Sequence, residues 1–225
     1  MIILQLLNLM DEVQAVDIFA IILAYALALV IAISVHEFAH AYVAYKSGDN
    51  TAKALGRLTL NPLKHISPIG LLMFVLVGFG WANPVPINPT KFKNYKRSMA
   101  FVSLAGIIVN IILAVVFAML SGWYDFVMAG AYSNMFQYFL SYFLYFVAIF
   151  NMSLAIFNLL PIYPLDGYNF LSVFLKPNNE FLMFMRKYGT IVLLVFLLTP
   201  LFDIVFMFFM NLLNYVFAMI PMLFF

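Results

Sequence analysis

Long apolar segments that contain no basic residue constrain the fold of this chain more than any other feature. Its Lys and Arg residues fall into three clusters, and none occurs in 1–45, 98–175 or 188–225. Hydrophobic residues make up 66% of the 225 residues and charged residues only 9%, which is too few charges to cover a soluble surface. The same composition excludes a disordered chain, and a net charge of +2 gives no reason to expect a nucleic-acid partner. We therefore predict a single integral membrane domain over 1–225, in contact with the lipid bilayer.

The basic clusters predict the topology of this domain. They cover 46–64, 91–97 and 176–187. Because Lys and Arg concentrate in short cytoplasmic loops, we place all three clusters inside the cell. A spanning helix needs about 20 apolar residues, which predicts spans at about 17–45, 98–121 and 135–160. The N-terminus and the loop around Tyr124 then lie outside.

Two apolar segments are less regular. Segment 66–82 has basic clusters on both sides, so a full span would carry one cluster outside. We expect it to be re-entrant, with a short helix followed by extended backbone, although a short true span stays open. Glycines and prolines at its end and just after it favour extended or turn structure. Segment 188–225 is interrupted by Pro200 and is apolar apart from Asp203, which leaves one kinked helix or two short ones as alternatives.

The first predicted span contains HEFAH at 36–40. His36 and His40 are four residues apart, so on a helix both imidazoles face the same point and can hold one Zn²⁺. Glu37 is rotated by about 100° from His36, which places it beside the metal as a general base. A single buried His is usually only a hydrogen-bonded core residue. Three ionisable side chains in one span are costly to bury and have no evident structural role, so we interpret them as functional.

Two imidazoles leave zinc short of its usual three protein ligands. The chain has no Cys, and His65 lies in a basic loop, so a carboxylate is the natural third ligand. Asp166 stands where the third span reaches the cytoplasmic side, at the depth expected for the two histidines. Alone, Asp166-Gly167 would be typical of a turn or a helix N-cap. We predict one zinc per chain, bound by His36, His40 and Asp166.

HEFAH within an apolar segment, followed by NLLPIYPLDG at 158–167, resembles the site-2 protease family of intramembrane zinc metalloproteases. The resemblance covers roughly 20–170. It implies an all-α polytopic membrane protein with a three-helix catalytic core at about 17–170. It also implies a re-entrant extended or β-hairpin segment, and we expect one or two C-terminal transmembrane helices in 188–225. Ser67 stands where family members commonly carry an acidic residue. We expect the small form without PDZ or CBS domains.

The same resemblance assigns roles to individual residues. His36, His40 and Asp166 would bind zinc, and Glu37 would be the catalytic base. Asn158 and Asn110 would hold the substrate backbone or the oxyanion, although an Asn in a membrane helix is as often a link between helices. GFGWANPVPIN resembles the membrane-embedded hairpin of the family. Its Gly80, Trp81 and Asn83 would then belong to a strand that holds the substrate.

The expected activity is hydrolysis of peptide bonds in the transmembrane segments of another membrane protein. We expect a multi-pass protein of a bacterial cytoplasmic membrane, with its active site toward the cytoplasm. There are two alternatives to a protease. The first is a zinc transporter or metal sensor, which would need further ligands along a pore. The second is a non-catalytic relative of the proteases, which would usually have lost Glu37 or a metal ligand. A homo-oligomer or a regulatory membrane partner stays open.

Overall fold

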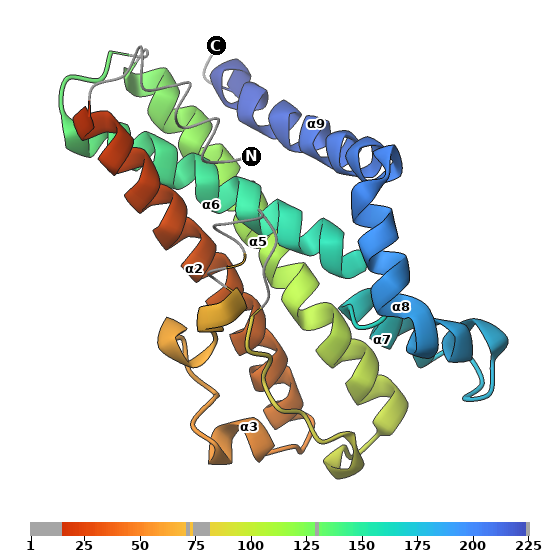
Figure 1. The fold of residues 1–225 in the computed structure, drawn as a ribbon. Coiled ribbons are helices and arrows are strands. Elements are labelled where there is room, and N and C mark those ends of the chain that lie inside the picture. The colour runs from red at the N-terminus through yellow and green to blue at the C-terminus, as the bar shows by residue number, and fades with distance from the viewer. Residues whose placement is uncertain (1–14, 71–72, 74–81, 129–130, 224–225) are drawn as a thin grey trace.

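Three long helices form the centre of the protein in the computed structural model, which describes residues 15–70, 73, 82–128 and 131–223 (Figure 1). They are α2 (Ala15–Lys46), α5 (Tyr95–Met128) and α6 (Met135–Leu159). Each of the three packs against the other two. Their positions agree with the three predicted spans, although α5 is longer at both ends. The chain is an integral membrane protein of mainly α-helical structure, as the composition predicted.

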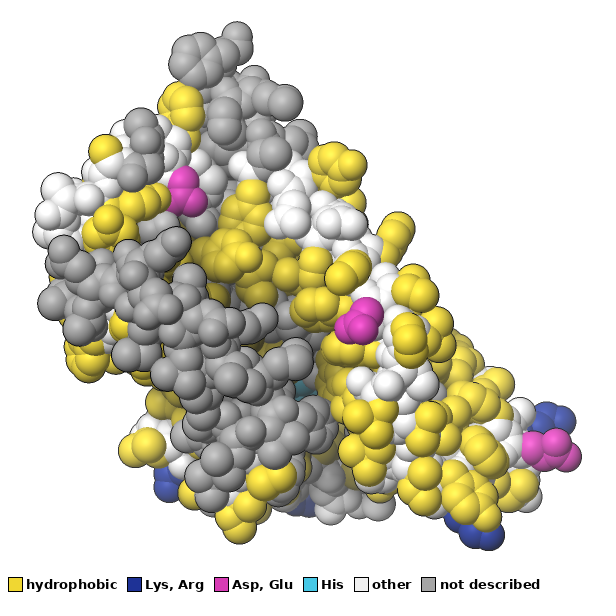
Figure 2. Space-filling model, turned by 45° about the horizontal axis from the view of Figure 1, so that its top comes forward, with side chains coloured by type: hydrophobic (Ala, Val, Ile, Leu, Met, Phe, Trp, Pro, Cys, Tyr) yellow, Lys and Arg dark blue, Asp and Glu magenta, His cyan; other side chains and the backbone are white. Residues whose placement is uncertain are grey.

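Small side chains allow these helices to pack closely. On α2 the residues at four-residue intervals on one face have no exposed surface: Ala20, Ala24, Ala28 and Ala32. On α5 a matching buried row follows the same spacing: Gly106, Asn110, Ala114 and Ala118. Lipid gives no hydrophobic reason for helices to associate, so close van der Waals contact between small residues drives packing in a membrane. The larger apolar side chains point outward, and they cover much of the surface in Figure 2.

The C-terminal segment consists of two helices, α8 (Glu180–Leu198) and α9 (Pro200–Leu223). Pro200 cannot donate a backbone hydrogen bond and disfavours helix at the residue before it, so Thr199 is extended and separates them. Helix α8 begins eight residues before the predicted segment, because the side chain of Asn179 accepts hydrogen bonds from the first-turn amides. Helix α9 packs on α5 and α6. In the described part of the chain, α2, α5, α6 and α8 are long and apolar enough to cross a membrane.

The segment between α2 and α5 contains the short helix α3 (Thr51–Ala54) and the 3-10 turns η1 (Pro62–Lys64) and η2 (Pro89–Lys91). Ile66 and Ala82 form an isolated antiparallel bridge, which brings together the two ends of the predicted re-entrant segment. Most of that segment lies outside the described residues, so its hairpin stays a prediction. The helix ends that carry the basic clusters lie at the same, lower end of the bundle in Figure 1, and Figure 2 shows Lys and Arg gathered there.

Candidate metal and catalytic centre

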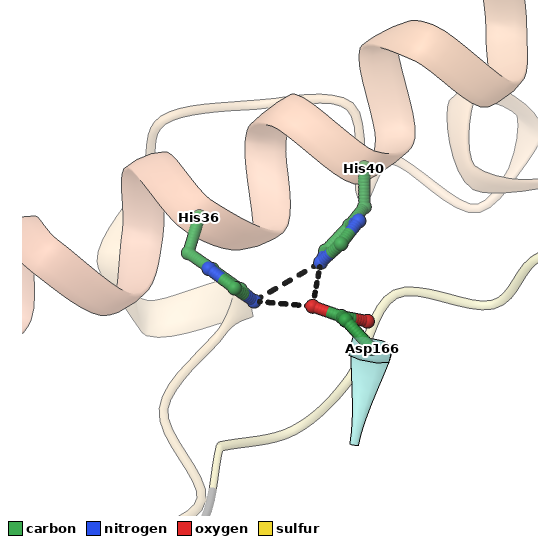
Figure 3. A group of neighbouring side chains, drawn as sticks. All are labelled: His36, His40 and Asp166. Atoms are coloured by element: carbon green, nitrogen blue, oxygen red, sulfur yellow. Dashed lines mark hydrogen bonds and ion pairs between the residues drawn. The ribbon is translucent and has the colours of Figure 1, made fainter. Parts of the chain in front are cut away.

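Helix α2 presents His36 and His40 on the face that packs toward α5. The two residues lie one helical turn apart, and their Nε2 atoms are 3.0 Å from each other (Figure 3). Both side chains are buried. The predicted convergence of the two imidazoles on one point is therefore present in the structure.

Asp166 reaches the same point from a different element. Helix α6 ends at Leu159, before Pro161 and Pro164, and Asp166 is the first residue of α7 (Asp166–Ser172). Its Oδ2 lies 3.2 Å from Nε2 of His36 and 3.0 Å from Nε2 of His40. A Cβ at Gly167 would overlap the carbonyl oxygens at the end of α6, so only glycine allows this turn to place Asp166 so close to the helix end.

These three side chains fit a zinc ion. Their ligand atoms all lie within 4.8 Å of one another. Zinc bonds of about 2.0–2.2 Å in a tetrahedron put ligand atoms about 3.3 Å apart, close to the separations found here. Oδ2 of Asp166 is buried, and its described polar neighbours are the Nε2 atoms of the two histidines. Two imidazoles and one carboxylate are also a donor set that catalytic zinc uses, with one position left open.

Helix α5 packs against both imidazole rings. The backbone carbonyl of Val102 lies 2.7 Å from Nδ1 of His40, which fixes the ring so that Nε2 is free to bind metal. Gly106 lies directly against both imidazoles: a Cβ there would be 2.5 Å from Cε1 of His36 and 2.6 Å from Nε2 of His40. This contact of Gly106 was not among the predictions from sequence. A glycine inside an otherwise regular span was the signal that could have indicated it.

Glu37 lies beside the three ligands. It is buried, and its Oε2 accepts a hydrogen bond of 2.8 Å from the backbone N–H of Val85. Glu37 is not among the three described residues that could hold a metal together, and its role as a base stays a prediction. The contact with Val85 has no counterpart among the sequence predictions.

A cavity of about 510 Å³ opens on the centre. His36, Glu37, His40 and Asp166 line it together with apolar side chains of α2 and α6. Asn158 also lines the cavity, and its Nδ2 donates to the carbonyl of Leu154.

The other residues that were predicted to contact substrate do not line the described part of this cavity. Asn110 is fully buried, its amide has no hydrogen-bond partner among the described residues, and it is absent from the described lining of the cavity. Asn83 is exposed, next to the lining residues Ala82 and Pro84. Gly80 and Trp81 lie outside the described residues.

The chain is similar to a peptidase family and to proteins named as zinc metalloproteases. The model of "Peptidase family M50" matches residues 126–199, which include Asp166 but not HEFAH. "Putative zinc metalloprotease YwhC" of Bacillus subtilis (strain 168) is 41% identical over 177 residues, which are 77% of this chain and 79% of that protein. "Putative zinc metalloprotease Rip2" of Mycolicibacterium smegmatis is 33% identical over 77% of this chain and 68% of its own length. No solved structure matches the chain. The identity to these relatives over most of both chains shows that the protein belongs to peptidase family M50, the site-2 protease family.

Proposed function

We propose that this protein is a zinc-dependent intramembrane endopeptidase that cleaves other membrane proteins within or near their transmembrane segments. The observation that carries the proposal is the group of His36, His40 and Asp166, with Glu37 beside it, on helices of a chain that spans the membrane. A purely structural zinc site would be closed by a fourth protein ligand. Among the described residues only these three form a group that could hold a metal, and a cavity adjoins them.

Each residue has a distinct role in this mechanism. His36, His40 and Asp166 hold one zinc per chain, which when bound supplies the Lewis acidity that polarises water and the scissile carbonyl. Glu37 accepts a proton from the attacking water and then donates it to the leaving amine. The bond from Val85 engages Oε2 of Glu37, which leaves Oε1 to exchange the proton.

The substrate must be extended before it can be cut, because a helical substrate keeps its amides hydrogen-bonded within itself. The segment that includes Gly80, Trp81 and Asn83 would hold the unwound chain by adding backbone hydrogen bonds. The pairing is partial, since Pro84 and Pro86 have no N–H. Asn158 would bind the substrate backbone from the wall of the cavity, and Asn110 has the same proposed role on the strength of the family resemblance alone.

The position of the basic residues supports a cytoplasmic location for the site. His36 and His40 lie in the last three turns of α2, which ends at Lys46. Because basic residues favour the cytoplasmic side, the centre would face the cytoplasm of a bacterial cell and take water from that side. A zinc transporter would instead need a succession of ligand groups, and the described residues contain one.

Co-expression with candidate single-span membrane proteins tests the proposal. We expect the wild-type protein to cleave a substrate and Glu37→Gln to lose about 10²–10⁴-fold in rate, because an amide keeps the shape of the side chain but cannot accept the proton. Zinc content should stay near one per chain, since the ligands are untouched. Glu180→Gln is the matched control, because Glu180 lies at the start of α8 outside the centre. Normal cleavage by Glu37→Gln with zinc retained would remove Glu37 from the mechanism.

A further inference from the structure

The segment Pro84-Val85-Pro86 has a single backbone N–H, and this N–H is directed at the carboxylate of Glu37. Proline has no amide hydrogen, so Val85 alone can donate. Its N–H lies 2.8 Å from Oε2 of Glu37, within the buried part of the centre. The orientation of this one peptide group therefore bears directly on how the carboxylate of Glu37 is held.

Arg57 holds the other side of the same peptide group. Its Nη2 donates to the carbonyl of Asn83 at 2.6 Å and to that of Pro84 at 3.3 Å. The carbonyl of Pro84 and the N–H of Val85 belong to one planar peptide unit, in which they point in opposite directions. A guanidinium on the carbonyl side thus fixes the direction of the N–H on the opposite side. Hydrogen bonds from a charged donor are about twice as strong as neutral ones. The shorter of the two Arg57 bonds holds the preceding Asn83–Pro84 peptide, and the longer one reaches the Pro84–Val85 peptide itself.

The position of Arg57 is itself set by the end of helix α3. Gly56 has a φ of +64°, a left-handed conformation that glycine adopts without strain. The amide of Gly56 donates to the carbonyl of Lys53 at 3.0 Å, and the amide of Arg57 donates to that of Ala52 at 2.8 Å. These two bonds form a Schellman motif, which directs the chain so that Arg57 leaves α3 at a defined point.

Packing and further hydrogen bonds hold the rest of this segment. The side chain of Val85 is buried in a cluster with Ala41 of α2 and Ala52 of α3. Nearby, the amide of Asn83 donates to the carbonyl of His65 at 2.7 Å. The segment is therefore fastened to α2, α3 and the following loop, and Arg57 is the side chain that holds its carbonyls.

We propose that Arg57 is a positioning residue: through the Pro84–Val85 peptide it orients the carboxylate of Glu37 for proton transfer. The inference rests on the proposed protease function for its catalytic consequence, but not for the contact itself. Loss of Arg57 would remove the donor to the carbonyl side of this peptide, and the peptide could then tilt within a segment that packing still holds, so Glu37 would be oriented less strictly. Displacement of a reacting group by about 1 Å can cost about 10²-fold in rate.

Two measurements on Arg57→Gln test the proposal. The first is hydrogen exchange of a peptide covering 82–88, in which few amides contribute because of the prolines. We expect the Val85 amide to exchange roughly tenfold faster than in the wild type, with exchange in α5 unchanged. The second is the kinetic split: kcat should fall roughly 10- to 100-fold, while KM and zinc content stay near wild type. Arg57→Lys should fall between, because an ammonium keeps the charge but not the planar fork of donors.

Lys53→Gln is the matched control. It removes the same charge from α3, four residues before Arg57, and its ammonium contacts the hydroxyl of Tyr45 rather than the 83–85 segment. Unchanged exchange at Val85 in Arg57→Gln would overturn the proposal, as would equally faster exchange in α5, which indicates a general folding defect. If the wild type cleaves no substrate, the protease proposal fails, and the exchange comparison still decides the role of Arg57.

Discussion

Gly106→Ala is expected to weaken the metal centre although it adds only one methyl group. The new Cβ would lie 2.5 Å from Cε1 of His36, 2.6 Å from its Nδ1 and 2.6 Å from Nε2 of His40. Optimal separations for such atoms are about 3.5–4.0 Å, so the overlap is about 1 Å against two imidazoles at once. Either the rings rotate away from the ligand geometry or α5 moves away from α2.

Two opposing effects determine the size of this change. Alanine favours helix over glycine by about 0.8–1.0 kcal/mol, which would stabilise α5. Inserting a methyl group into a packed site costs about 1–3 kcal/mol, and here the cost falls on the ligands. Disturbing the groups that orient metal ligands typically costs about 10- to 100-fold in affinity. We therefore expect weaker zinc binding by that factor, with little loss of helix content.

Zinc stoichiometry and chelator competition on the protein purified in detergent measure this effect. Ile108→Ala is the control, since Ile108 lies two residues further along α5 and is half exposed on the outer surface. Zinc binding by Gly106→Ala equal to that of the wild type would refute the steric reasoning, because it would mean that α5 yields without disturbing the histidines.

Two further predictions concern the loops and the topology. Asp49 is buried and accepts hydrogen bonds from the amides of Thr51 and Asn88. Burial raises the pKa of its carboxyl group. The two amide bonds, a hydrogen bond from the Thr51 hydroxyl and the charge of Lys91 outweigh this effect and hold the pKa below its usual range. Asp49→Asn should therefore lower the free energy of unfolding by about 1–3 kcal/mol at neutral pH. This difference from wild type should shrink as the pH falls below about 4, where the wild-type carboxylate becomes protonated. Thermal unfolding in detergent at several pH values measures the difference, and an unchanged difference at low pH would contradict this reasoning. Because the chain has no Cys, a cysteine at Lys93 should resist an impermeant thiol reagent added outside intact cells, whereas one at Tyr124 should react; external labelling at Lys93 would refute the topology.

Much of the centre could be predicted from sequence because ionisable residues are costly to bury in a membrane. In an apolar span, HEFAH stands out, and the helical period places His36 and His40 on one face without further information. Asp166 followed from the need for a third ligand at the same depth. The division of the C-terminal segment could not be decided, because Pro200 is compatible with a kink as well as a break.

The sequence by itself determined the three central spans, the spacing of the histidines and the donor groups of the proposed ligands, because these depend on hydrophobicity and on local helix geometry. Only the tertiary structure identified the contacts of Val102, Gly106 and Val85 with the centre. These contacts join segments far apart in the chain, and each depends on a backbone group or on the absence of a side chain. A backbone N–H or carbonyl is present at nearly every residue, so no residue type indicates which one will meet Glu37 or His40. That choice is made by packing of α2 against α5 and α3.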